Sequence, residues 1–136
     1  MASGDLHTSR PRVLVVDDDP VVLAIVSELL SETGYRVDIR DQALGTAQWV
    51  VKQQPDFVLL DVKMPALSGG ELSQLIRKQA MSHVDVILHS SMEADDLNSL
   101  ALSAGALGAI KKTPNTKLFL AEFERLVARA RASRPR

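Results

Sequence analysis

The stretch from Asp56 to Pro65 constrains the fold more than any other part of this sequence. Its four apolar residues from Phe57 onward end on the carboxylate of Asp61. Such a run predicts a strand over 57–61 that is buried on both faces, and Pro65 stops it because proline has no N–H to donate. In open parallel sheets, ligands bind at the carboxyl ends of the strands. We therefore expect Asp61 to lie at the functional edge of a sheet.

The rest of the chain alternates between strand-like and helix-like segments. Strands are predicted over 12–17, 35–39, 57–61, 85–90 and 108–112. Helices are predicted over about 20–33, 42–53, 69–81, 93–104 and 115–130, from the spacing of their apolar residues and from end signals such as Asp19-Pro20. This alternation is typical of a parallel sheet covered on both faces. Right-handed crossovers then favour a flavodoxin-like (βα)5 doubly wound α/β fold with strand order 2-1-3-4-5.

That strand order makes three carboxylates neighbours. It places Asp17 and Asp18, which follow the first strand, beside Asp61 at the end of the third. Two like charges about 4 Å apart repel by roughly 4 kcal/mol at an effective dielectric near 20, so the cluster needs raised pKa values or a bound cation. Oxygen ligands point to Mg²⁺, Mn²⁺ or Ca²⁺ rather than zinc. A carboxylate in such a place can also attack a phosphoryl group and form an aspartyl phosphate.

Two further strand ends carry groups that could bind the oxygens of a phosphoryl group. Ser90 closes the fourth strand and offers a hydroxyl, and Lys112 closes the fifth and offers an ammonium. The sequence thus gathers a nucleophile, a candidate cation site and two phosphoryl-binding groups on one edge. Some of these polar residues could have purely structural roles instead. Asp19 could serve as a helix cap, which is the role we favour for it, and the Ser90 hydroxyl could bond to nearby backbone.

Taken in chain order, these motifs resemble the signature set of bacterial two-component response-regulator receiver domains. The matching segments are Val-Leu-Val-Val-Asp-Asp-Asp-Pro ending at Pro20, Leu-Leu-Asp-Val-Lys-Met-Pro ending at Pro65, Ser90-Ser91, and Gly105-Ala106 followed by Lys112. The resemblance extends from about 12 to 129, which is nearly the whole chain. Each motif alone is weak, but the ordered set on successive strand ends is specific.

The resemblance implies a role for each site residue. Asp61 is the phosphoacceptor, Asp18 contacts Mg²⁺ directly, and Asp17 holds it through water. The backbone carbonyl of Lys63 is a further Mg²⁺ ligand. Ser90 and Lys112 contact the phosphoryl oxygens.

Three positions depart from the pattern that the resemblance sets. Ala109 stands where receivers usually carry a Tyr or Phe ring, and Thr113 separates Lys112 from the proline that usually follows it. His89 occupies a place that is more often apolar, and strand alternation turns it away from the side of Ser90. With no ring at Ala109, we expect a switch confined to the loop that begins at Ser91 and to the start of the next helix.

The resemblance also implies partners. A histidine kinase or phosphotransfer protein would donate the phosphoryl group, and we expect a stand-alone receiver that signals by binding a downstream protein or by phosphate relay. A homodimer could form through the fourth helix, fifth strand and fifth helix. No enzymatic activity is expected beyond self-phosphorylation and self-dephosphorylation at Asp61. The alternatives are a degenerate receiver that acts as a phosphorylation-independent docking module, and an aspartyl-nucleophile phosphatase, which would need an acid where the chain has Lys63.

Composition excludes several other classes. The 136 residues contain no cysteine, so disulfides and thiolate chemistry are excluded and a cytoplasmic location is expected. No apolar run is long enough to cross a membrane. The first ten residues contain no apolar stretch of the kind found in secretory signals, so we expect that they are not such a signal. The basic C-terminal residues lack aromatic platforms, so a nucleic-acid partner is not favoured. We expect a flexible arm over 1–11, the receiver domain over 12–130 and a basic tail over 131–136.

Overall fold

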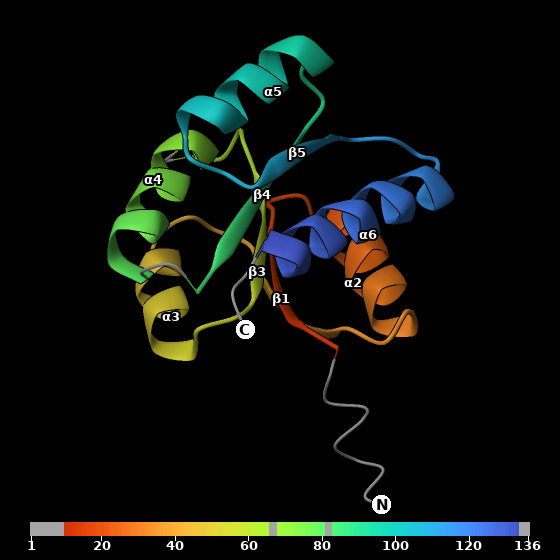
Figure 1. The fold of residues 1–136 in the computed structure, drawn as a ribbon, viewed down its shortest axis with the longest axis horizontal. Coiled ribbons are helices and arrows are strands. Elements are labelled where there is room, and N and C mark those ends of the chain that lie inside the picture. The colour runs from red at the N-terminus through yellow and green to blue at the C-terminus, as the bar shows by residue number, and fades with distance from the viewer. Residues whose placement is uncertain (1–9, 66–67, 81–82, 134–136) are drawn as a thin grey trace, which may run out of the picture.

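A computed structural model describes residues 10–65, 68–80 and 83–133. Within these ranges, one sheet of parallel strands has the order β2-β1-β3-β4-β5 (Figure 1). The strands are β1 (Arg12–Val16), β2 (Arg36–Arg40), β3 (Phe57–Asp61), β4 (Asp85–Ser90) and β5 (Gly108–Lys111). The helices are α2 (Pro20–Glu32), α3 (Thr46–Gln53), α4 (Gly69–Ala80), α5 (Ala94–Ser103) and α6 (Thr116–Ser133). The predicted flavodoxin-like fold and its strand order are confirmed.

The apolar runs of the sequence become the inner strands of the sheet. Every residue of β3 is buried, as are all but the first residues of β1 and β4. The edge strands β2 and β5 contain fewer apolar residues, and most of their residues are half-buried or exposed. The register pairs Val16 with Leu60 and Asp61 with His89, so the carboxyl ends of the inner strands lie level with one another.

Helices cover both faces of the sheet and enclose two apolar layers. In Figure 1, α3, α4 and α5 lie on one side of the strands, and α2 and α6 lie on the other. The largest side chains that are almost wholly buried on the α2–α6 side include Leu30, Phe57, Leu59, Ile87, Phe123 and Leu126, and those on the other side include Leu14, Leu60, Leu72, Ile76, Leu88 and Leu97. This double burial is what the unbroken apolar strands require.

Several element ends differ from those predicted. The first and last strands stop one residue early, so Asp17 and Lys112 lie in loops just beyond them. Helix α3 begins at Thr46 rather than at 42, because Gly45 has a left-handed φ of 81° and the Thr46 hydroxyl bonds to the Gln42 carbonyl. Strand β2 begins and ends one residue later than predicted. The sequence predicts that the helix before β4 ends at Met81, and this residue lies outside the described part of the chain.

Both predicted tails are partly bound to the fold. Arg10 was expected in the flexible arm, but its guanidinium lies 3.6 Å from the Glu124 carboxylate and 4.9 Å from the centre of the Tyr35 ring. The Tyr35 hydroxyl donates to the same Glu124 side chain. At the other end, α6 continues to Ser133, three residues into the predicted tail.

Candidate functional site

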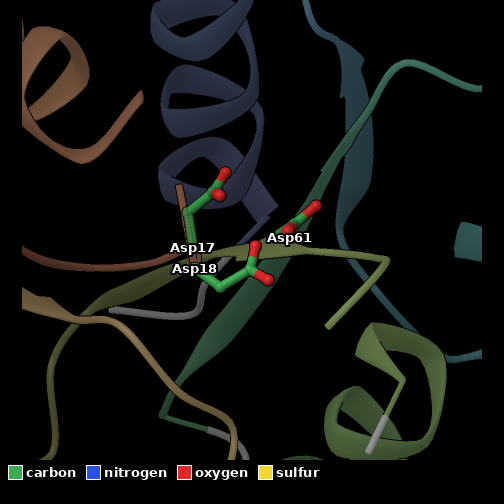
Figure 2. Close-up of side chains that lie close together, drawn as sticks. All are labelled: Asp17, Asp18 and Asp61. Carbon is green, nitrogen blue, oxygen red and sulfur yellow. The ribbon is translucent and has the colours of Figure 1, made fainter. Parts of the chain in front are cut away.

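Three carboxylates gather at one end of the sheet. Asp17 and Asp18 follow β1, and Asp61 is the last residue of β3; each offers one oxygen, and these oxygens lie within 4.8 Å of one another (Figure 2). Asp17 and Asp61 are buried, with exposed fractions of 1% and 5%, whereas Asp18 is exposed. The predicted neighbourhood of these residues is therefore confirmed, and its single exposed member leaves the cluster open to solvent.

Backbone amides fix Asp17 and Asp19, two of the three acids that follow β1. The Asp19 amide donates to Asp17 Oδ1 at 2.9 Å. The Asp19 carboxylate in turn accepts from the Val21 amide at 2.9 Å and caps α2, so its predicted role as a helix cap is confirmed. Asp19 is thereby separated from its two neighbours in function, and Asp17 and Asp18 remain as the candidate ligands.

Lys112 joins the two buried carboxylates. Its Nζ lies 2.9 Å from Asp17 Oδ2 and 3.3 Å from Asp61 Oδ1. Its backbone amide donates to the Ser90 carbonyl at 2.8 Å, which fixes the chain just beyond β5 so that the side chain can reach across the strand ends. Burial lowers the pKa of Lys112, but the hydrogen bonds and charges of Asp17 and Asp61 outweigh burial and raise it overall. The ammonium therefore stays charged at neutral pH.

Asp61 is under electrostatic strain despite this ion pair. Burial and the charge of Asp17 raise its pKa, and the opposing effects of Lys112 and of the Lys63 amide, which donates to Asp61 Oδ1 at 3.4 Å, do not cancel the rise. The Lys112 ammonium thus pairs with two of the three clustered carboxylates. A further cation at this place would relieve the repulsion between them.

The donor set fits a hard divalent cation. The three clustered groups offer only oxygen, as Mg²⁺ prefers. In addition, the buried Asp17 Oδ2 makes one polar contact within the described part of the chain, the 2.9 Å pairing with the Lys112 ammonium. A carboxylate oxygen has more than one lone pair, so Asp17 Oδ2 could also accept a hydrogen bond from a metal-bound water.

Ser90 lies at the end of β4 and is buried, with 2% of its surface exposed. Its Oγ accepts a hydrogen bond from the Met92 amide at 3.2 Å, so the bland prediction of a bond to nearby backbone is confirmed. Accepting this bond leaves the hydroxyl hydrogen free to be donated. The predicted contact of Ser90 with a phosphoryl group stays a prediction, as does that of the Lys63 carbonyl with Mg²⁺.

His89 belongs to the opposite layer. Its ring centre lies 5.3 Å from that of Phe119 on α6, and only 5% of its surface is exposed. Burial and the Lys112 charge lower the pKa of His89 to about 4, although Asp17 opposes the shift. The prediction that this side chain fills the core on the side away from Ser90 agrees with this packing.

Ala109 leaves a hollow beside β5. A cavity of ≈ 270 Å³ is lined there by Ala109 and by residues of α5 and α6, among them Leu97 and Leu118. Sequence reasoning missed a feature next to it: the Lys111 ammonium donates to the carbonyl oxygens of Ser91 and Met92. Strand alternation could have placed Lys111 on the side of Ala109, but nothing in the sequence indicated its acceptors.

Comparison with known proteins gives a family match over most of the chain. Residues 13–124 match the family described as response regulator receiver domain. The chain is 28% identical over 120 residues to response regulator MprA of Mycobacterium leprae, a match that covers 88% of this chain and 52% of that protein. It is 33% identical over 141 residues to protein-glutamate methylesterase/protein-glutamine glutaminase 1 of Anaeromyxobacter dehalogenans, covering 92% of this chain and 40% of that protein. The chain thus spans about half the length, or less, of these relatives.

A solved structure shows the same fold. The response regulator domain of Thermotoga maritima CheB superposes with a TM-score of 0.78 and 26% identity, covering 93% of this chain and 99% of that one.

Proposed function

Because the chain belongs to the response regulator receiver domain family, we propose that it accepts a phosphoryl group on Asp61. The observation that carries this proposal is the place of the Asp61 carboxylate, which ends a buried strand between an acidic partner and the Lys112 ammonium. A carboxylate oxygen of Asp61 would attack the phosphorus of the donor. The bond from phosphorus to the donor's leaving group would break, and the product would be an aspartyl phosphate.

Asp17, Asp18, Asp61 and the Lys63 carbonyl would hold Mg²⁺. When bound, the ion supplies positive charge that offsets the negative charge of the carboxylates and of the incoming phosphoryl oxygens. The protein's own groups do the rest: Lys112 already lies within 3.3 Å of Asp61 Oδ1 and would move onto a phosphoryl oxygen, and the free hydrogen of the Ser90 hydroxyl would be donated to another.

The signal would leave the site through the loop after β4. A population shift needs groups that interact differently with the two states, and here these are the Ser90 and Lys112 contacts with the phosphoryl group. Drawing Ser90 toward Asp61 would carry the loop from Ser91 and the start of α5 with it. Since Ala109 has no ring to move, the backbone of β5 would stay nearly still.

Partners follow from the same proposal. A histidine kinase or a phosphotransfer protein would donate the phosphoryl group, and a downstream protein would respond to the altered loop or take up the phosphoryl group by relay. A homodimer through α5, β5 and α6 is a further proposal, as is a cytoplasmic location. Among the described residues, no helix combines the length and the apolar character that a membrane span needs.

The experiment that tests the proposal is intact-mass measurement after incubation with acetyl phosphate and Mg²⁺. The wild type should gain one phosphoryl adduct, and Asp61→Asn should gain none. Asp41→Asn, which alters an exposed acid of the loop after β2, is the matched control and should behave as the wild type. An adduct of equal yield on Asp61→Asn would refute the assignment.

The docking module remains the second candidate. Ala109 provides no aromatic ring, the usual switch element, and a cavity lies beside it. Amide shifts on adding beryllofluoride and Mg²⁺ separate the two functions. The phosphorylation switch predicts large shifts over 90–96 and small ones over 108–110. Shifts that stop at the immediate site would favour the docking module, and large shifts in β5 would mean that another group replaces the ring.

A further inference from the structure

Lys111 is exposed on an edge strand, yet its ammonium donates to two backbone carbonyl oxygens of a neighbouring loop. It is the last residue of β5, and its Nζ lies 2.9 Å from the Met92 carbonyl oxygen and 3.3 Å from that of Ser91. Both acceptors belong to the loop between β4 and α5, immediately after Ser90. The same loop is held from within by the Met92 amide, which donates to Ser90 Oγ. Lys111 therefore fixes the segment that carries a candidate phosphoryl-binding group.

The order of the strands gives this contact a direction. β4 lies between β3, which ends on Asp61, and β5, which ends on Lys111 (Figure 1). The loop that follows Ser90 therefore has the phosphoacceptor on one side and the Lys111 ammonium on the other. A displacement of Ser90 toward Asp61 is a displacement of the loop away from the strand that holds Lys111.

We propose that Lys111 is a positioning residue that holds the β4–α5 loop toward β5 in the resting state and opposes the movement of Ser90 toward a phosphoryl group on Asp61. The inference rests on the proposed function and adds to it the group that sets the resting position. The hollow beside Ala109 supports the proposal. A cavity of ≈ 270 Å³ borders both Ala109 and Lys111, so no aromatic ring fills the space on the β5 side of the loop and restrains the loop in place of Lys111.

The expected size of the effect is modest and its sign is diagnostic. Exposed hydrogen bonds from a charged donor contribute little each and are partly offset by the entropy of the lysine side chain. Losing two of them should favour the displaced loop about three- to ten-fold, equivalent to about 0.7–1.4 kcal/mol. Charge alone predicts the opposite, because removing a cation near a site that gains an anion weakens binding of that anion.

The test is a titration of Lys111→Met with beryllofluoride in the presence of Mg²⁺, followed by the amide shifts around Ser90. Lys117→Met removes an equal charge from an exposed position in the first turn of α6 and is the matched control. Lys111→Met should bind about three- to ten-fold more tightly than the wild type, with Lys117→Met unchanged. Equal or weaker binding by Lys111→Met, or equal tightening by Lys117→Met, would overturn the proposal.

A second measurement separates this inference from the proposed function. Hydrogen exchange of the Met92 amide, measured without any phosphoryl mimic, should be several-fold faster in Lys111→Met than in the wild type. Unchanged exchange would show that Lys111 does not hold the loop. A wild type that binds no beryllofluoride and gains no adduct would refute the phosphoacceptor, whereas the exchange rate would still decide whether Lys111 restrains the loop.

Discussion

His89 should make the free energy of unfolding of this protein depend on pH between about 6.5 and about 4. The residue is 5% exposed, its ring packs against Phe119, and its pKa is lowered from 6.5 to about 4. The unfolded chain therefore binds a proton on His89 as pH falls below about 6.5, while the folded protein does so only near 4. The free energy of unfolding must decrease across this interval.

The magnitude follows from the shift. A difference of about 2.5 pKa units corresponds to about 3 kcal/mol when the loss is complete, at 1.36 kcal/mol for each unit. Most of this, about 2 kcal/mol, should already be lost near pH 5. The loss begins below the unfolded-state value of about 6.5 and levels off below the folded-state value of about 4. Asp61 acts in the opposite direction, because a raised carboxyl pKa makes the folded state gain stability as pH falls.

Urea unfolding from about pH 7.5 to about pH 4.5 measures this dependence. The difference between the wild type and His89→Gln isolates the contribution of His89, because every other titrating group, Asp61 included, is common to both. Parallel profiles for the wild type and His89→Gln would refute the reasoning and would mean that the ring is hydrated or that protonation moves it into solvent.

Three further results are expected. Asp61→Asn should raise the free energy of unfolding by about 1 kcal/mol at neutral pH, because it removes a buried charge that faces another acid, and the gain in thermal or urea stability should shrink in acid. Gly108→Ala should cost about 1–3 kcal/mol in urea unfolding, because the new Cβ would lie 2.7 Å from a methyl carbon of the buried Leu126; an unchanged midpoint would contradict the overlap. Asp18→Ala should weaken Mg²⁺ binding in calorimetry by ten-fold or more, while Asp41→Ala should not, and equal affinities would remove Asp18 from the ligand set.

The inner strands could be predicted from sequence because burial on both faces leaves a direct record in composition. Both ends of β3 and of β4 lie where the apolar runs indicate. The strand order then brought Asp17 and Asp61 together without any knowledge of side-chain positions. The fold and the placement of the candidate site were thus predictable from the same pattern, since the apolar runs of the inner strands end on or just before Asp17, Asp61 and Ser90 at one edge of the sheet.

Contacts between distant segments account for what the sequence did not reveal. The start of α3 at Thr46 depends on the left-handed Gly45 and also on Arg40 of β2, which donates to the Thr46 hydroxyl and so supports a turn where helical spacing alone predicts helix. Arg10 is fixed by Glu124 of α6, more than a hundred residues away along the chain. Lys111 has the same local sequence whether its ammonium is solvated or bound to the loop. In each case one partner lies on another element, and local pattern carries no information about it.

The site and the core make opposite contributions to stability, and this opposition explains how a small charge change could act as a signal. The two apolar layers stabilise the fold without reference to the strand ends, whereas Asp17 and Asp61 are held together against burial and mutual repulsion with one ammonium between them. Such local conflict with an otherwise consistent fold is typical of functional positions. A bound cation would relieve it, and a phosphoryl group would change which acceptors compete for Lys112 and Ser90. Among the described residues, the exposed pair of bonds from Lys111 joins the loop beyond Ser90 to β5, so a shift of Ser90 toward Asp61 would move this loop against a weak restraint.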